Sequence, residues 1–254
     1  HVASDIPEHG QYIPNDALRT HHNLNDINEW TTNQKMIISE KKTKSMIINF
    51  TNNYQFGTRL SLNNTNLEIV NQMTILGTII TDKLKWDENC DMIIAKVNKR
   101  MLFLKKVLSF GSTGEEMVHL WIIYCRSYLE QCATVWSSSL SQENKEDLER
   151  TQKSFAKLIL KQEYSNYETA LLKLNLQTLE QRRRELCLNF AKDSIKNEVL
   201  DDLFPTNYKE NSKETRNREK YAVTHANTDR LRNSSIIYMQ NLLNEEYQKE
   251  KSEN

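Results

Sequence analysis

The sequence predicts a predominantly helical α+β fold in which short strands precede a helical bundle. Three observations support this prediction. The 254-residue chain is 38% hydrophobic and 27% charged, with only five glycines and three prolines, which is typical of helical proteins with much solvated surface. Short β-branched runs separated by polar turns occur before residue 87. After residue 87, apolar side chains recur at spacings of three and four, as on one face of an amphipathic helix.

The part of the chain before residue 87 is expected to combine short helical and strand elements. Residues 1–22 show little periodicity and are predicted to form an irregular loop. A short amphipathic helix with apolar Leu24, Ile27 and Trp30 follows and ends near Asn33. Strands are predicted in three stretches, the last of which contains an Asn-Asn turn: 35–38, 45–50 and 59–70.

Residues 73–82 form an apolar run of strand length that a single glycine interrupts. Gly77 follows Leu76 at the point where a bend would need a residue without a Cβ. We therefore predict a hairpin or bent strand here.

A long helix is predicted over 87–108. Its apolar positions fall on one stripe: Ile93, Val97, Met101, Leu104 and Leu108. Four basic residues lie on the opposite side: Lys96, Lys99, Arg100 and Lys106. Acidic residues at its start and lysines at its end follow the order that the helix dipole favours, and Gly111 then ends the helix.

Further helices are expected after residue 111, forming an array of four or five with short connections. A capping box of Thr113 and Glu116 begins one helix that continues to Trp136, and Ser141 begins the next. The others are predicted over 167–174, 178–197 and 234–246, and a polar stretch over 205–220 is expected to be mobile. The sequence thus divides into three parts: residues 1–86, 87–200 and 201–254.

No catalytic or metal-binding pattern is evident in the sequence. Gly-rich phosphate loops and the patterns GxSxG, HExxH and CxxC are all absent. The four cysteines are expected to be reduced, mostly buried thiols of an intracellular protein, cytoplasmic or nuclear. No apolar run reaches the ~18 residues that a membrane span needs, and no signal peptide is evident. Since residue 1 is not methionine, the chain is expected to be processed or to begin inside a longer product.

The formal net charge is zero, so any affinity for nucleic acid must come from local basic faces. Three basic clusters are candidates: Lys41, Lys42 and Lys44; the helical set Lys96, Lys99, Arg100 and Lys106; and Arg182, Arg183 and Arg184. Each is equally explained as solvated surface. No acidic residue lies over 95–110, and Phe103 is placed to contact a sugar or base, so the second cluster favours binding of a nucleic-acid backbone.

The order of these pieces resembles the C-terminal part of a reverse transcriptase from a non-LTR, LINE-like retrotransposon, over nearly the whole chain. The residues that carry the resemblance are Trp30, Lys35-Met36, the run 41–47, the run 75–80, Leu84, Trp86, the run 148–153 and the run 230–236. The resemblance implies that 1–86 is the end of the palm domain with a hairpin like the primer grip. It implies that 87–200 is a thumb that grips a template–primer duplex, and that 201–254 is a linker and tail helix.

Individual residues are assigned by the same resemblance. Lys42 matches a lysine proposed to help nucleotide selection or proton transfer to pyrophosphate, whereas Ser39 stands where many relatives carry Asn. Leu76 and Gly77 match the primer grip. The helix with Lys96, Lys99, Arg100 and Lys106 corresponds to the thumb surface that contacts the duplex backbone.

The family's catalytic aspartates, including a Tyr-x-Asp-Asp box, are not found in these residues. The parent enzyme uses Mg²⁺ and dNTPs, and two-metal phosphoryl transfer requires those carboxylates. We therefore expect a fragment of an RNA-directed DNA polymerase of a mobile element that is inactive alone and holds no cofactor. Its expected partners are a template–primer duplex and the missing N-terminal polymerase portion. The alternative is a non-catalytic helical orphan or interaction protein derived from a retroelement.

Overall fold

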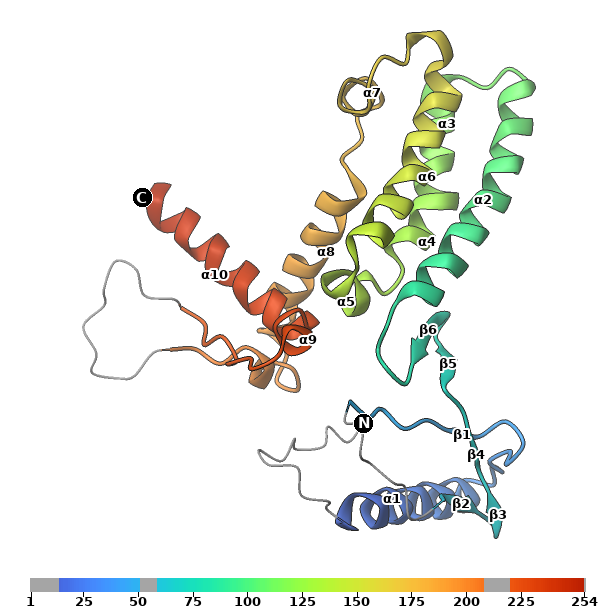
Figure 1. The fold of residues 1–254 in the computed structure, drawn as a ribbon, viewed down its shortest axis with the longest axis vertical. Helices are drawn as coiled ribbons and strands as arrows, with labels where there is room; N and C mark the ends of the chain where they lie inside the picture. The colour runs from blue at the N-terminus through green and yellow to red at the C-terminus, as the bar shows by residue number, and fades with distance from the viewer. Residues whose placement is uncertain (1–13, 51–58, 208–219, 254) are drawn as a thin grey trace. The chain divides into compact units, whose positions relative to one another are not determined.

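The computed structural model describes residues 14–50, 59–207 and 220–253 (Figure 1). It is a predominantly helical α+β structure with a few short strands. Backbone contacts divide the chain into two compact units, which we call the N-terminal unit (His1–Lys85) and the helical unit (Trp86–Asn254).

The N-terminal unit begins with a helix, α1 (Pro14–Asn33), that is longer than the sequence predicts. Residues 14–22 were expected to form a loop and are helical instead. Proline is compatible with the first turn of a helix, because its φ angle is already helical and its missing N–H has no partner there. Pro14 is therefore compatible with the start of the helix.

Among the described residues, the strands of the N-terminal unit form three separate pairs. They are β1 (Lys44–Ser45), β2 (Ser61–Leu62), β3 (Thr65–Asn66), β4 (Glu68–Ile69), β5 (Gln72–Ile75) and β6 (Thr78–Thr81). β1 pairs with β4 in parallel, and β2–β3 and β5–β6 are antiparallel. The predicted strand over 35–38 is absent, and the one over 45–50 is reduced to β1. Ile37 is 93% exposed, so an apolar run without a ladder partner did not become a strand.

Both antiparallel pairs close through two residues with positive φ, as the type I′ hairpin turn requires. Asn63 and Asn64 have φ values of 49° and 66°, and asparagine tolerates this conformation. Leu76 and Gly77 have φ values of 49° and 82°. The hairpin predicted over 73–82 is therefore confirmed, with Leu76 and Gly77 forming its turn.

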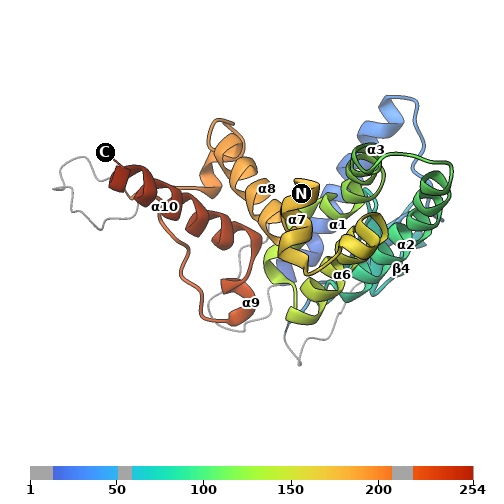
Figure 2. The ribbon, with the colours of Figure 1, turned by 90° about the horizontal axis from the view of Figure 1, so that it is seen from above.

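The helical unit is built around two long helices, α2 (Asp87–Ser109) and α6 (Gln142–Leu160), which pack against each other. The other helical segments are α3 (Gly114–Trp121), η1 (Ile122–Arg126), α4 (Ser127–Glu130), α5 (Ala133–Trp136), η2 (Ser137–Ser139), η3 (Lys161–Glu163), α7 (Tyr167–Leu174), α8 (Leu179–Ser194), η4 (Asp201–Leu203), α9 (Asp229–Arg232) and α10 (Ser235–Glu253). Figure 2 shows α6 between α2 and α7, both of which it contacts.

Local capping confirms most of the predicted helix boundaries. Thr113 and Glu116 form the predicted capping box of α3, and Thr178 forms a second one at α8. Ser141 caps α6 as expected. Gly111, with a φ of 94°, follows the end of α2. The side chains of Thr113, Ser141 and Thr178 accept hydrogen bonds from backbone N–H groups that would otherwise lack partners in the first helical turn.

The single helix predicted from Thr113 to Trp136 is wrong, because the structure interrupts it twice. The segment η1 is a π-helix, and Cys132 has a left-handed φ of 51° before α5. Buried side chains recur here every four residues: Met117, Trp121, Cys125, Leu129 and Ala133. A spacing of four exceeds the α-helical turn by about 0.4 residue at each step, so the stripe would drift out of the core. The wider π turn offsets this drift and keeps the stripe buried.

The C-terminal helix α10 lies in the helical unit, where it packs against α8. Its contact is an apolar core that includes Cys187, Phe204 and Leu242. Two buried amides fix the segment before α10: Asn244 exchanges hydrogen bonds with the backbone of Tyr221, and Gln240 bonds the backbones of residues 203 and 224. Of the stretch predicted to be mobile, 208–219 lie outside the described residues.

Candidate nucleic-acid interface

Four basic residues of α2 are candidates for binding, and two of them, Lys96 and Arg100, lie where this helix faces η1 and α4. We call Lys96, Lys99, Arg100 and Lys106 the cationic face. Lys99 and Lys106 are exposed, whereas Lys96 and Arg100 are half-buried beside the core stripe. The Arg100 guanidinium lies 3.8 Å from the ring centroid of Tyr128 and 5.5 Å from that of Tyr124. The Lys96 ammonium lies 5.7 Å from the Tyr128 ring. These cation–π contacts orient two of the four charges.

Two exposed aromatic rings extend this surface. The side chains of Phe103 and Tyr124 are both 47% exposed, and their ring centroids are 5.5 Å apart. Sequence reasoning identified Phe103 but missed Tyr124 and Tyr128. The sequence does carry a signal for them: Tyr124 and Tyr128 are four residues apart, and each directly precedes a residue of the apolar stripe, Cys125 or Leu129. Bases and sugars stack on such rings, so the surface offers aromatic contacts next to positive charge.

The charges of the cationic face are not neutralised by ion pairs. None of its four residues forms an ion pair with a carboxylate in the described part of the chain. The three acids of α2, Asp87, Glu88 and Asp91, lie in its first two turns, toward the opposite end from Lys106. The face is thus able to accept phosphate oxygens without competition from a paired acid.

The predicted residue Lys42 lies in the N-terminal unit, on an exposed turn after α1. The backbone N–H groups of Lys42 and Thr43 donate to the Ser39 carbonyl at 3.1 and 3.0 Å. Ser39 therefore closes this turn through its backbone, which an asparagine at that position would also supply. Lys44 is ion-paired with Glu68, so Lys41 and Lys42 are the two lysines of this tract that form no ion pair with a described carboxylate.

The predicted residues Leu76 and Gly77 also lie in the N-terminal unit, at the tip of the β5–β6 hairpin. Leu76 is 84% exposed, so it is not a buried strand residue. The seven predicted binding residues are thus split: Lys42, Leu76 and Gly77 in the N-terminal unit, and the cationic face in the helical unit.

The arginine cluster of α8 is not a solvated basic patch. Arg182 donates to Glu130 at 3.0 Å and to Glu185 at 3.1 Å, and the bond to Glu130 raises its pKa. Arg184 pairs with Glu245 of α10. Arg183 is buried, at 3% exposure. Arg182 and Arg184 therefore join α8 to α4 and α10, Arg183 lies in the interior, and the three do not form one binding surface.

The described residues contain no group of three or more His, Cys, Asp or Glu side chains arranged to hold a metal ion. Cys90 and Cys125 are buried free thiols, and burial raises their pKa values to about 12 and about 11. Thiols that remain protonated at neutral pH are poor nucleophiles. In the described segments, every helix is too short or too polar to span a bilayer. Comparison of the chain with protein-family models, with curated proteins and with solved structures gave no match.

Proposed function

We propose that this chain is the C-terminal part of a reverse transcriptase of a non-LTR retrotransposon, and that its helical unit binds a template–primer duplex. The ordered motif residues from Trp30 to Ile236 support the family. The observation that carries the binding function is the cationic face, which is free of ion pairs to described carboxylates and borders the exposed rings of Phe103 and Tyr124.

Binding would be directed to the sugar-phosphate backbone. Lys99 and Lys106 reach phosphates as mobile point charges. The Arg100 guanidinium is held over the Tyr128 ring, and the N–H groups at its edge donate to phosphate oxygens. Each phosphate contact releases counterions, so log K is expected to fall with log[salt] with a slope of roughly −0.9 per contact, or about −3 to −4 for four contacts. The proposal is a non-specific, salt-sensitive duplex grip.

The proposal assigns binding to this chain and leaves catalysis to residues outside it. No Tyr-x-Asp-Asp box occurs in the 254 residues. Two-metal nucleotidyl transfer needs carboxylates that hold both ions. A polymerase portion carrying them is therefore the proposed protein partner, and Lys42, Leu76 and Gly77 are proposed to act beside its active site.

The test is fluorescence anisotropy with a labelled RNA–DNA primer–template at 50 mM salt and above. In Lys99→Glu/Lys106→Glu, two exposed charges are reversed without removing a buried side chain. We expect binding at least tenfold weaker and a salt slope shallower by about two units. The matched control is Lys196→Glu/Lys249→Glu, which reverses two other exposed lysines of the helical unit and gives the same net charge. No binding at low salt, or equal weakening of both double variants, would contradict the proposal.

Exposed apolar side chains on the same unit favour a second candidate function, a helical interaction protein. Leu102, Phe110 and Ile123 are 61%, 89% and 68% exposed. The formal net charge of zero is compatible with a protein partner. In that case the Lys99→Glu/Lys106→Glu variant would keep its helicity by circular dichroism, and neither it nor the wild type would bind the duplex.

A further inference from the structure

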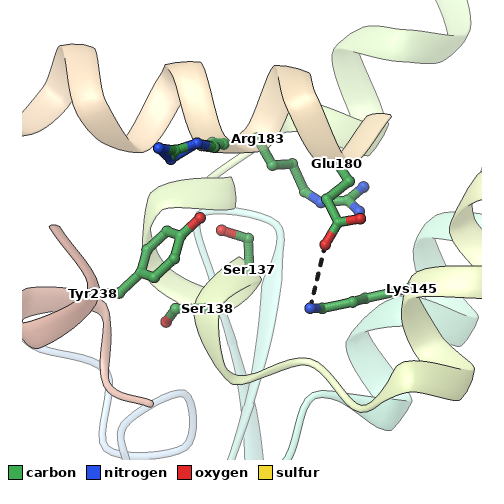
Figure 3. Close-up of a pocket in the computed structure, with 7 residues that line it drawn as sticks. Ser137, Ser138, Lys145, Glu180, Arg183 and Tyr238 are labelled. Carbon is green, nitrogen blue, oxygen red and sulfur yellow. Dashed lines mark ion pairs between the residues drawn. The ribbon is translucent and has the colours of Figure 1, made fainter. Parts of the chain in front are cut away.

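A small polar pocket lies within the helical unit, and no residue of the cationic face lines it (Figure 3). Its volume is about 50 Å³. Residues of η2, α6, α8 and α10 line it: Ser137, Ser138, Lys145, Glu180, Arg183, Arg184 and Tyr238.

The buried guanidinium of Arg183 is the central feature of this pocket. Its Nη1 atom is buried and has no hydrogen-bond partner. Glu149 and Glu180 act on it only at longer range, because Glu149 bonds the Leu179 N–H and Glu180 pairs with Lys145 at 3.3 Å. Burial lowers the pKa of Arg183, the direction expected for a charge that lacks full compensation. A buried charge in this condition strongly favours a bound counter-ion.

Hydroxyl groups surround the same space. The hydroxyl oxygens of Ser137 and Tyr238 point toward one another beneath α8 (Figure 3). Burial raises the pKa of Tyr238, so its hydroxyl remains a donor. The Ser138 hydroxyl is buried without a hydrogen-bond partner. The Ser137 hydroxyl also shares a hydrogen bond with Cys187 Sγ at 3.4 Å, so the pocket offers the Tyr238 and Ser138 hydroxyls as its donors.

Three long side chains that line the pocket are partly exposed. The side chains of Glu180, Arg184 and Lys145 are 66%, 38% and 34% exposed. The ionisable lining residues comprise three cations and one carboxylate. Lys145 is ion-paired with Glu180 and Arg184 with Glu245, so Arg183 is the lining cation that has no ion pair among the described residues.

We propose that this pocket binds a single phosphate group, with Arg183 as its principal contact. Guanidinium and hydroxyl donors match the oxygens of a tetrahedral phosphate. A cavity of ~150 Å³ is known to hold benzene, so a space of about 50 Å³ admits a group of a few heavy atoms and excludes a nucleoside. The site is separate from the duplex-binding function proposed above and does not depend on it.

Thermal unfolding of the full chain in phosphate and in chloride of equal ionic strength tests the site. We expect wild-type Tm to rise by roughly 5–10 °C when phosphate is about 100-fold above its dissociation constant. Arg183→Met should lose this rise, and its Tm in chloride should equal or exceed that of the wild type, because the unpaired buried charge is gone. The matched control is Arg150→Met, which removes an exposed arginine of α6 and should keep the rise.

Two results would overturn the proposal. One is an equal phosphate-dependent rise in wild type and Arg183→Met, which would reflect only the general stabilising effect of phosphate salts. The other is no rise in either protein. Tyr238→Phe keeps the ring and removes one donor, so it provides an independent check if Arg183→Met does not fold. By calorimetry it should weaken phosphate binding about tenfold, and unchanged affinity would count against the site.

The phosphate group could belong to the free ion or to the end of a larger molecule. Calorimetric titrations with inorganic phosphate, a 5′-phosphorylated tetranucleotide and its 5′-hydroxyl form distinguish these sources. Arg183-dependent binding of inorganic phosphate alone assigns the free ion. Tighter, Arg183-dependent binding of the phosphorylated tetranucleotide assigns a nucleic-acid end. Binding of neither would refute the site, and duplex binding by the cationic face should persist in Arg183→Met in every case.

Discussion

The two units of this chain differ in how far their large apolar side chains are buried. In the helical unit, Trp121 and Trp136 are fully buried, each at 0% exposure. In the described part of the N-terminal unit, Leu62 and Leu67 are the buried hydrophobic residues, whereas Trp30 is 58% exposed. Burial of apolar surface is the main force that stabilises a fold. The difference indicates that the helical unit has its own core and that the N-terminal unit lacks a comparable one.

The largest expected effect comes from separating the units at the boundary between Lys85 and Trp86. A protein of residues 86–254 should unfold in one cooperative transition, because it keeps its core. A protein of residues 1–85 should show no cooperative transition. Circular dichroism with thermal and urea denaturation measures both. A cooperative transition in the 1–85 protein would show that the N-terminal unit has a stabilising core of its own.

Next in size is the contrast between two tryptophans. Trp121 stacks on Phe155 with ring centroids 4.6 Å apart, and its indole N–H donates to Gln152 at 3.3 Å. Trp121→Ala should lower the free energy of unfolding by about 3–5 kcal/mol. Trp30→Ala, at an exposed site, should change it by less than about 0.5 kcal/mol. Urea titrations give both values. Similar losses of unfolding free energy in the two variants would show that Trp30 stabilises the fold despite its exposure.

Alkaline pH should destabilise the helical unit through its buried thiols. The folded-state pKa of Cys90 is raised from 9.0 to about 12, so between these values the folded chain keeps a proton that the unfolded chain loses. Stability is therefore fully present below pH 9 and falls as pH rises, by up to about 1.4 kcal/mol per pH unit for this group. Cys90→Ala should show a shallower decline in urea midpoints between pH 9 and 11. Identical slopes for the two proteins would refute this assignment.

The smallest effect concerns the β5–β6 hairpin of the N-terminal unit. Leu76 occupies a left-handed conformation that asparagine adopts more readily, and Asn-Gly is the favoured pair for this turn. Leu76→Asn should stabilise the hairpin by about 1 kcal/mol or less. Gly77→Ala should destabilise it by a similar amount, because alanine resists a positive φ. Hydrogen exchange of the β5–β6 amides would report the change, and slower exchange in Gly77→Ala would contradict it.

Elements set by neighbouring residues could be predicted from the sequence. The caps at Thr113, Ser141 and Thr178 define the starts of α3, α6 and α8 through bonds within one helical turn. Short strands depend on partners distant in sequence, and β1 pairs with β4 across 24 positions. The apolar run over 35–38 has strand composition but no ladder partner among the described residues, so composition alone was misleading.

The candidate sites show the same division. The cationic face follows from helical periodicity, which the sequence displays directly. The stacking of Arg100 on Tyr128 required packing between α2 and α4. The burial of Arg183 is equally hidden, because three consecutive arginines look alike in a sequence and only tertiary contacts separate them.

The π turn at Ile122–Arg126 holds one residue more than a regular α-helix would place between the buried residues on either side of it. A one-codon deletion there would restore regular α-helical hydrogen bonding and keep Leu129 and Ala133 on the buried face. A second deletion would rotate everything downstream by about 100° about the helix axis, so both residues would leave the core together. This stretch should therefore tolerate the loss of one residue and not of two.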